Sequence, residues 1–169
     1  MSEAATKSVY SVDAFSDPVV VRVDGRACFQ NSTALRDFIG ERVKAGKRRF
    51  VLDFQHCASV DSTFLGVLAG AAIELRKLAA DASLVVTRVS PRNLELMRNL
   101  GLHRLLTIDV GGTVNVPRCD TALEAKRCTE IENARLVLAA HESLVTADEA
   151  NRAKFQDVLS FLRTRVEQG

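Results

Sequence analysis

The stretch Val60-Asp61-Ser62-Thr63-Phe64-Leu65-Gly66-Val67-Leu68 places two hydroxyl side chains where an apolar strand is expected to give way to a helix. Upstream, Arg49 to Phe54 predicts a strand that stops at the polar pair Gln55-His56. Downstream, apolar residues recur at helical spacing and predict a helix over 62–78: Leu65, Leu68, Ala69, Ala72, Ile73 and Leu75. Ser62 is therefore expected at or next to the N-terminus of a helix.

The expected position of Ser62 suits a phosphate. The first N–H groups of a helix have no partner within the helix, and the positive end of the helix dipole favours negative charge there. A phosphate on Ser62 would change a neutral surface to one carrying roughly two negative charges. Serine and threonine are also ordinary helix caps, so position alone leaves a purely structural role open.

Strands and helices alternate on both sides of this stretch. The remaining pattern predicts a strand over 19–23 that Asp24-Gly25 interrupts or turns, a helix from Asn31-Ser32 to Gly46, a strand over 83–87, a helix opened by Ser90-Pro91 and closed by Gly101, and a strand over 105–108. Such alternation is typical of an α/β fold with a sheet against helices. We assign residues 1–118 to one domain.

The sequence changes character from Asp120 onwards, where neither Pro nor Gly occurs until Gly169. Thr121 to Glu124 and Thr146 to Glu149 each fit a capping box, and each precedes an apolar stripe at helical spacing. We expect residues 119–169 to form a helical hairpin, with 141–145 as the connection. The hairpin helices are a candidate contact for a homodimer.

Composition excludes several classes of protein. A net charge of +2 and an aromatic content of 5% do not suggest a nucleic-acid surface. The four cysteines form no Cys-x-x-Cys pair and have no metal-site spacing to the histidines, so we expect reduced thiols and neither metal nor cofactor. No apolar run is long enough to span a bilayer, and Met1 to Tyr10 lacks the apolar core of a leader. We expect a cytoplasmic protein.

The order of elements and the motif around Ser62 resemble the STAS domain of bacterial anti-sigma-factor antagonists. The usual family segment is an apolar strand ending in Leu-Asp, a short loop, and then Asp-Ser-Ser/Thr-Gly-Leu-Gly-Val-Leu. Leu52-Asp53 and the run from Asp61 to Leu68 match this segment at every position but one. The likeness covers about residues 9 to 118 and implies a STAS-like mixed β-sheet packed against helices.

The resemblance also implies a regulatory cycle. In that family the Ser after Asp is phosphorylated by a partner that is both serine kinase and anti-sigma factor. The unphosphorylated antagonist binds this partner and frees the sigma factor, and a phosphatase resets the cycle. Carried to this sequence, the resemblance makes Ser62 the phosphorylation site, with Thr63 a secondary candidate. The predicted partner-binding loop is Asp61, Ser62, Thr63, Phe64 and Leu65.

Phe64 is the one departure from the family motif, because Gly usually stands there. Glycine leaves room for a partner to approach the start of the helix. A large aromatic residue either contacts a different partner or packs onto the protein's own body. Asp61 similarly has two interpretations, a second helix cap or an Asx-type bond that holds the loop.

Two other functions compete with the phosphorylation switch. A serine hydrolase would use Ser62 as nucleophile and His56 or His103 as base, but Val60 and Phe64 occupy the glycine positions of a nucleophile elbow. We therefore expect no enzymatic activity. A non-phosphorylated STAS scaffold, for example a subunit of a lipid-transport or signalling complex, would use the hairpin as its docking surface.

Overall fold

The computed structural model describes residues 9–169. Its strands are β1 (Tyr10–Asp13), β2 (Val19–Ala27), β3 (Arg49–Val60), β4 (Ser83–Thr87), β5 (Thr107–Asp109) and β6 (Thr121–Ala122). Its helices are α1 (Ser32–Lys44), α2 (Ser62–Leu78), α3 (Pro91–Asn99), the 3-10 turn η1 (Leu102–Arg104), α4 (Glu130–Ala147), α5 (Asn151–Lys154) and α6 (Gln156–Gln168). The expectation that Met1 to Tyr10 contains no leader falls almost wholly outside the described residues.

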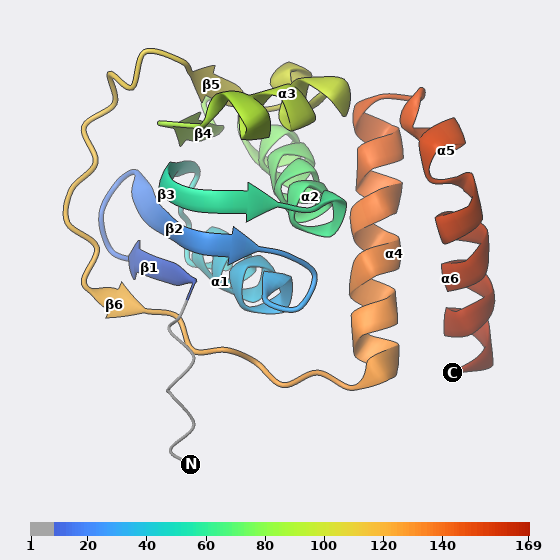
Figure 1. The fold of residues 1–169 in the computed structure, drawn as a ribbon. Helices are drawn as coiled ribbons and strands as arrows, with labels where there is room; N and C mark the ends of the chain where they lie inside the picture. Colours follow the sequence, from blue (N-terminus) through green and yellow to red (C-terminus); the bar gives the residue numbers. More distant parts are fainter. Residues whose placement is uncertain (1–8) are drawn as a thin grey trace.

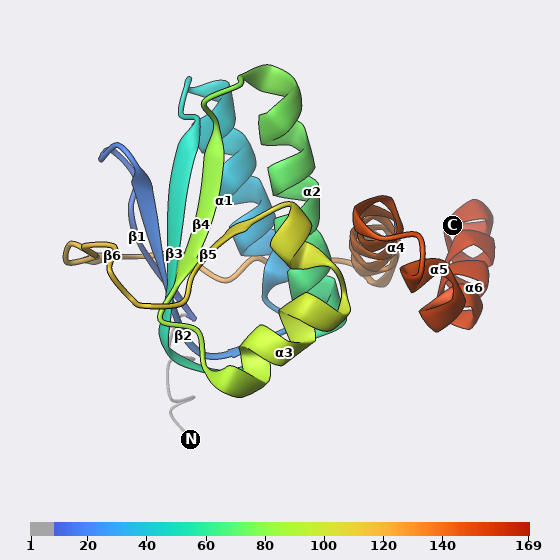
Figure 2. The same cartoon turned by 90° about the horizontal axis from the view of Figure 1, so that it is seen from above.

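The strands form one six-stranded mixed sheet in the order β5-β4-β3-β2-β1-β6 (Figure 1). Strands β2, β3, β4 and β5 pair with one another in parallel, whereas β1 is antiparallel to both β2 and β6. Helices α1 and α2 cover one face of this sheet, as Figure 2 shows. The expected α/β class with a mixed sheet against helices is confirmed.

The core lies between this sheet face and the helices. It is made of valine, leucine and phenylalanine residues from the strands and leucines from the helices, chiefly Val19, Val21, Val23, Phe50, Leu52, Phe54, Leu35, Leu65, Leu68 and Leu75. All of them are almost completely buried. Their alternation along β2 follows the two-residue period of a strand, so the same pattern that predicts the strand also selects its buried face.

Two central strands are longer than the sequence predicts. Strand β3 does not stop at Gln55-His56 but continues to Val60, because it pairs with β2 as far as the pair Ala27 and Val60. Strand β2 likewise passes through Asp24-Gly25, where the register shifts and Gly25 has a φ of +80°. The glycine permits a bulge in the strand rather than a turn out of it.

Helices α2 and α3 follow their local signals closely, whereas β5 does not. Helix α2 has the predicted bounds, and α3 begins at Pro91 with the Ser90 side chain accepting a hydrogen bond from the Asn93 N–H. Gly101 ends this segment in the left-handed region, with a φ of +76°. The predicted strand over 105–108 begins later, at Thr107, because η1 takes up the preceding residues.

The C-terminal helices are present, but their predicted boundaries are wrong. Thr121 starts no helix and instead pairs with Val12 as part of β6. The first long helix, α4, begins after Thr129, whose hydroxyl accepts from the Glu132 N–H. The predicted connection over 141–145 lies inside α4, and so does Thr146, so the turn falls at 148–150 instead.

Helix α4 lies against α2, and α6 lies on the outer side of α4 (Figure 2). A long segment over 110–129 leads from β5 at one edge of the sheet to β6 at the other and then to α4 (Figure 1). Within 9–169, none of the helices combines the length and the apolar character that crossing a membrane requires.

Candidate functional site

The start of α2 is fixed by Asp61. This residue has extended backbone angles, and its Oδ1 accepts a hydrogen bond of 2.8 Å from the Phe64 N–H. Its other oxygen, Oδ2, accepts a hydrogen bond of 2.8 Å from the Phe29 N–H. Asp61 therefore caps the helix, as one of its two interpretations expects, and its second oxygen also holds the loop between β2 and α1, which the sequence does not indicate.

Ser62 is the first residue of α2, and its hydroxyl contacts a histidine 79 positions away. The distance from Ser62 Oγ to His141 Nε2 is 2.9 Å, and His141 Nδ1 lies 2.7 Å from the Val137 carbonyl oxygen. A carbonyl oxygen only accepts, so Nδ1 carries the proton and, in the neutral ring, Nε2 is the acceptor. The Ser62 hydroxyl thus donates its hydrogen bond to His141.

His141 is a buried residue of α4 with 3% of its surface exposed. Its ring meets the ring of Phe155 edge to face at 4.7 Å between centroids. The bond to Val137 fixes the tautomer and the ring contact fixes the orientation, so a defined nitrogen atom faces Ser62. Helix α4 covers the hydroxyl that the sequence marks as the phosphate acceptor.

The next three predicted loop residues lie in the interior. Phe64 is 0% exposed, with its ring stacked on Tyr10 at 6.4 Å and edge-on to Phe54 at 5.9 Å. Thr63 and Leu65 are also buried. Phe64 is therefore a core residue rather than an exposed anchor, and burial raises the pKa of the neighbouring Tyr10 hydroxyl far above its ordinary value. Of the predicted contact residues, only Asp61 and Ser62 are partly exposed in this arrangement.

A cavity of about 440 Å³ opens beside Ser62. Its walls are mainly apolar and come from β3, α2, the end of α3 and the junction between α5 and α6: Val60, Leu65, Leu96, Leu100 and Phe155. Lys154 lies at the same cavity and donates a hydrogen bond of 2.7 Å to the Asn99 carbonyl oxygen. The site therefore combines a helix N-terminus, a hydroxyl, a histidine and one ammonium group.

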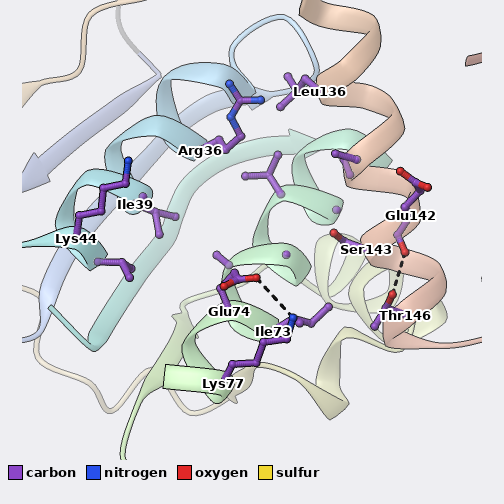
Figure 3. Close-up of a pocket in the computed structure, with 18 residues that line it drawn as sticks. Arg36, Ile39, Lys44, Ile73, Glu74, Lys77, Leu136, Glu142, Ser143 and Thr146 are labelled. Carbon is purple, nitrogen blue, oxygen red and sulfur yellow. Dashed lines mark hydrogen bonds and ion pairs between the residues drawn. The ribbon is translucent and has the colours of Figure 1, made fainter. Parts of the chain in front are cut away.

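A larger cavity, of about 610 Å³, lies further along α2 and does not include Ser62. Figure 3 shows that its walls come from α1, α2 and α4, with charged side chains around an apolar interior. Arg36, Lys44 and Lys77 contribute cations to this lining, and Glu74 and Glu142 contribute carboxylates. Lys77 is paired with Glu74 at 3.7 Å.

Asn151 attaches the C-terminal turn to the domain body. Its side chain is 0% exposed, and its Nδ2 donates to the carbonyl oxygens of Leu100 at 2.9 Å and Leu144 at 2.7 Å. One bond therefore reaches the segment after α3 and the other reaches α4. Asp148 adds contacts nearby, with a carboxylate oxygen 3.6 Å from an Arg104 nitrogen.

The sequence identified Asp61 and Ser62 but missed His141 and Asn151. No local pattern marks either residue, since both meet the site only through the packing of α4. The two histidines named for the hydrolase alternative, His56 and His103, are exposed and form no hydrogen bond to Ser62. A base for Ser62 would have to be His141, so that part of the hydrolase hypothesis is wrong. Residues 9–169 contain no cluster of three or more His, Cys, Asp or Glu suited to a metal ion.

Comparison with known families gives one sequence match. Residues 10–107 match the family described as Mlab, STAS domain. The matched segment ends within β5, so it contains Ser62 and α2 but none of the helices α4 to α6. A search of curated proteins gives no match.

Two solved structures share the fold at low sequence identity. The anti-sigma factor antagonist SpoIIAA in its unphosphorylated form is 16% identical, with a TM-score of 0.50 over 64% of this chain and 89% of that chain. A Thermotoga maritima protein assigned as a candidate anti-sigma factor antagonist is 15% identical, with a TM-score of 0.50 over 59% of this chain and 84% of that one. At such identities the likeness establishes the fold.

Proposed function

The chain belongs to the STAS domain family, and on that premise we propose that it is a partner-binding regulator of the anti-sigma-factor-antagonist type, switched at Ser62. A serine kinase that also acts as an anti-sigma factor phosphorylates Ser62, and a phosphatase removes the phosphate. The supporting observation is the place of Ser62, a partly exposed residue at the start of α2 beside a cavity.

The geometry gives the phosphate a large physical effect. Ser62 Oγ lies only 2.9 Å from His141 Nε2, so a phosphoryl group has no room there while α4 is in place. The helix dipole stabilises the added charge, whereas the apolar walls of the adjoining cavity do not. Phosphorylation therefore changes both the charge and the shape of the surface that the partner contacts.

The test is intact mass measurement and phosphosite mapping of the protein purified from its native host under several growth conditions. We expect one added phosphate that Ser62→Ala abolishes and that Ser59→Ala, at the end of β3, retains. Thr63 is 4% exposed, and we expect no phosphate on it. An unmodified Ser62 under every condition contradicts the switch.

A second candidate is the non-phosphorylated scaffold, and it is favoured by the outer face of α6. Phe161 is 69% exposed and Val158 is 41% exposed, and these two residues stand three positions apart on one side of the helix. In this alternative, α6 binds the domain to other subunits of a signalling or lipid-transport complex. Ser62 then serves only in the contact between α2 and α4.

Co-purification followed by mass spectrometry separates the two candidates. The scaffold predicts that Phe161→Ser removes stably bound subunits, while Phe15→Ser, at an 84% exposed site in the β1–β2 connection, leaves them bound. The switch predicts a kinase or phosphatase whose recovery depends on Ser62 rather than on Phe161. Loss of the same partner with either Phe variant would contradict the assigned role of α6.

A further inference from the structure

Helix α4 occupies the face of α2 that begins at Ser62, and the fit is closest at Gly66. A Cβ atom added at Gly66 would lie 2.3 Å from the Ala140 carbonyl oxygen and 2.7 Å from the Ala140 Cβ. The two helix backbones approach so closely there that no larger residue fits at position 66 without movement. At the Ser62 end, the hydrogen bond to His141 completes the same contact.

Beside this close contact, space remains between α4 and α1. The cavity of about 610 Å³ separates α4 from α1 and is bordered by small residues of α4, including Ala139 and Ser143 (Figure 3). The facing wall is aliphatic, with Ile39 and Val43 from α1 and Val67, Ala71 and Ile73 from α2. A helix with larger aliphatic residues in place of Ala139 would therefore bury more apolar surface than α4 does.

The charged residues at the cavity also indicate which charge on a docked helix would be favourable. Lys44 borders the cavity and forms no ion pair with any residue in 9–169, whereas Lys77 is paired with Glu74. On α4, Glu142 also borders the cavity, but its carboxylate is already paired with Arg163 of α6 at 3.6 Å. An acidic side chain on a docked helix would find an available cation at Lys44.

The connection to the body allows α4 to move away. Between β5 and α4 the described chain over 110–129 contains only the two-residue strand β6. At the other end, the attachment includes the Asn151 bonds to Leu100 and Leu144, the buried side chain of Leu144, and the polar contacts of Asp148 and Lys154. The core between the sheet, α1 and α2 includes only Leu144 of α4, so these elements keep their own core when α4 leaves.

We propose that this face of α2 and the adjoining cavity form a helix-docking surface, that α4 is its resident occupant, and that an amphipathic helix of a protein partner replaces α4. The replacing helix has a small residue against Gly66, bulky aliphatic residues over the cavity, a hydrogen-bond acceptor at Ser62 and an acidic residue near Lys44. This inference rests on the proposed function, since it describes how the partner reaches Ser62. Residues 130–169 are then an autoinhibitory segment.

The test uses fluorescein-labelled peptides of residues 129–148 as probes of the full-length protein. Two isomeric peptides differ only in the position of one added leucine. Ala139→Leu adds a side chain at the border of the cavity, whereas Ala140→Leu adds one where the Ala140 Cβ already lies close to Gly66. We expect the Ala139→Leu peptide to bind about tenfold more tightly than the Ala140→Leu peptide by fluorescence anisotropy.

A reversible lock provides the matched protein control. The Cβ of Ser143 is 3.7 Å from a Cβ built at Gly70, a distance that suits a disulfide, so Gly70→Cys with Ser143→Cys should close α4 onto α2. Cys128→Ser removes the partly exposed native thiol. We expect the oxidised lock to bind neither peptide and the reduced form to recover binding. Asn151→Ala should bind the Ala139→Leu peptide at least about threefold more tightly than the wild type, because α4 is then held less firmly.

Three results would overturn the proposal: equal binding of the two peptides, equal binding to the oxidised and reduced lock, or no binding to any form. If Asn151→Ala fails to fold by circular dichroism, the comparison of the oxidised with the reduced lock still decides. None of these measurements involves a phosphate. An unmodified Ser62 would therefore contradict the proposed switch without affecting the docking surface. Equal binding of the two peptides would contradict the docking surface without affecting the switch.

Discussion

The domain body, residues 10–109, and the C-terminal helices, residues 130–169, are held by different kinds of contact. The body has one continuous cluster of large buried side chains from sheet and helices. The junction between α2 and α4 has a separate small cluster of Val67, Leu136 and Ala140, together with the Gly66 approach and the Ser62–His141 hydrogen bond. Only Leu144 of α4 belongs to the main cluster.

Because of this difference, we expect the junction between α2 and α4 to be less stable than the domain body. Burial of large apolar side chains contributes about 1.5–3 kcal/mol for each residue, whereas a hydrogen bond contributes a net 0.5–1.5 kcal/mol or so. The junction therefore depends on fewer and weaker contributions than the body does. We expect α4 to leave α2 under changes that do not unfold the sheet.

The largest expected effect comes from Phe64→Ala, which removes a fully buried ring from the body. We expect a loss of about 3–5 kcal/mol in the free energy of unfolding, because the substitution leaves a cavity between Tyr10 and Phe54. Urea denaturation followed by circular dichroism measures it. The matched control is Phe161→Ala on α6, which is 69% exposed and should change stability by no more than about 0.5 kcal/mol. Equal losses at the two positions would contradict this difference in stability between the two regions.

The second effect is confined to the junction. Gly66→Ala places a methyl group 2.3 Å from the Ala140 carbonyl oxygen, and we expect overpacking of about 1–3 kcal/mol to push α4 away. Hydrogen exchange with mass spectrometry should show loss of protection in 130–168 with β2 and β3 unchanged. Gly40→Ala in α1 is the control, because apart from its own helix backbone and chain neighbours no atom lies within 4 Å of the added methyl, and it should stabilise the protein by about 0.5–1 kcal/mol. Unchanged protection of α4 in Gly66→Ala would mean that the helices adjust without separating.

The fold of the body could be predicted where local signals agree. Helix α2 begins and ends where the cap and the apolar stripe place it, and α3 begins at the Ser90-Pro91 pair. The C-terminal boundaries could not be predicted, because a Thr followed three residues later by Glu occurs at 121, 129 and 146. Thr121 pairs with β1 and so belongs to β6. Thr146 lies inside α4, where its hydroxyl donates a hydrogen bond to the Glu142 carbonyl oxygen. Tertiary contacts, which the local pattern does not contain, decide that Thr129 is the one of the three that begins a helix.

The site shows the same limit. Asp61 and Ser62 could be identified because the strand-to-helix transition is local in sequence. His141 could not, since its role depends on how α4 is placed against α2. Gly66 and Gly70 offered a usable signal, because glycines four positions apart on an otherwise apolar helix indicate a close approach by another backbone. That signal predicts a neighbouring helix but does not say which one.

A smaller effect compares thiols from the two regions. Burial raises the pKa of the Cys57 thiol in β3 to about 11, so at pH 8 about one molecule in a thousand carries the reactive thiolate. Its alkylation by iodoacetamide should be slow and should rise about tenfold for each pH unit until the pH reaches that pKa. Cys128, just before α4, is partly exposed, with its Sγ 3.4 Å from Thr33 Oγ1. We expect Gly66→Ala to speed the labelling of Cys128 and not that of Cys57, as peptide mass spectrometry would show. Faster labelling of both thiols would mean that the body opens together with α4.

The last prediction concerns the hydrogen bond between Ser62 and His141, which joins the two regions. We expect no hydrolytic activity from this pair. A Ser-His pair resembles part of a catalytic triad, but His141 Nδ1 is bound to the Val137 carbonyl, where a triad has a carboxylate. The His141 ring is also held against Phe155, so the pair serves to hold α4 on α2. Hydrolysis of p-nitrophenyl acetate should be equally slow for the wild type, Ser62→Ala and His141→Gln. An acyl burst that requires both Ser62 and His141 would show that the junction is an active site, and it would make residues 130–169 part of a catalyst rather than a cover.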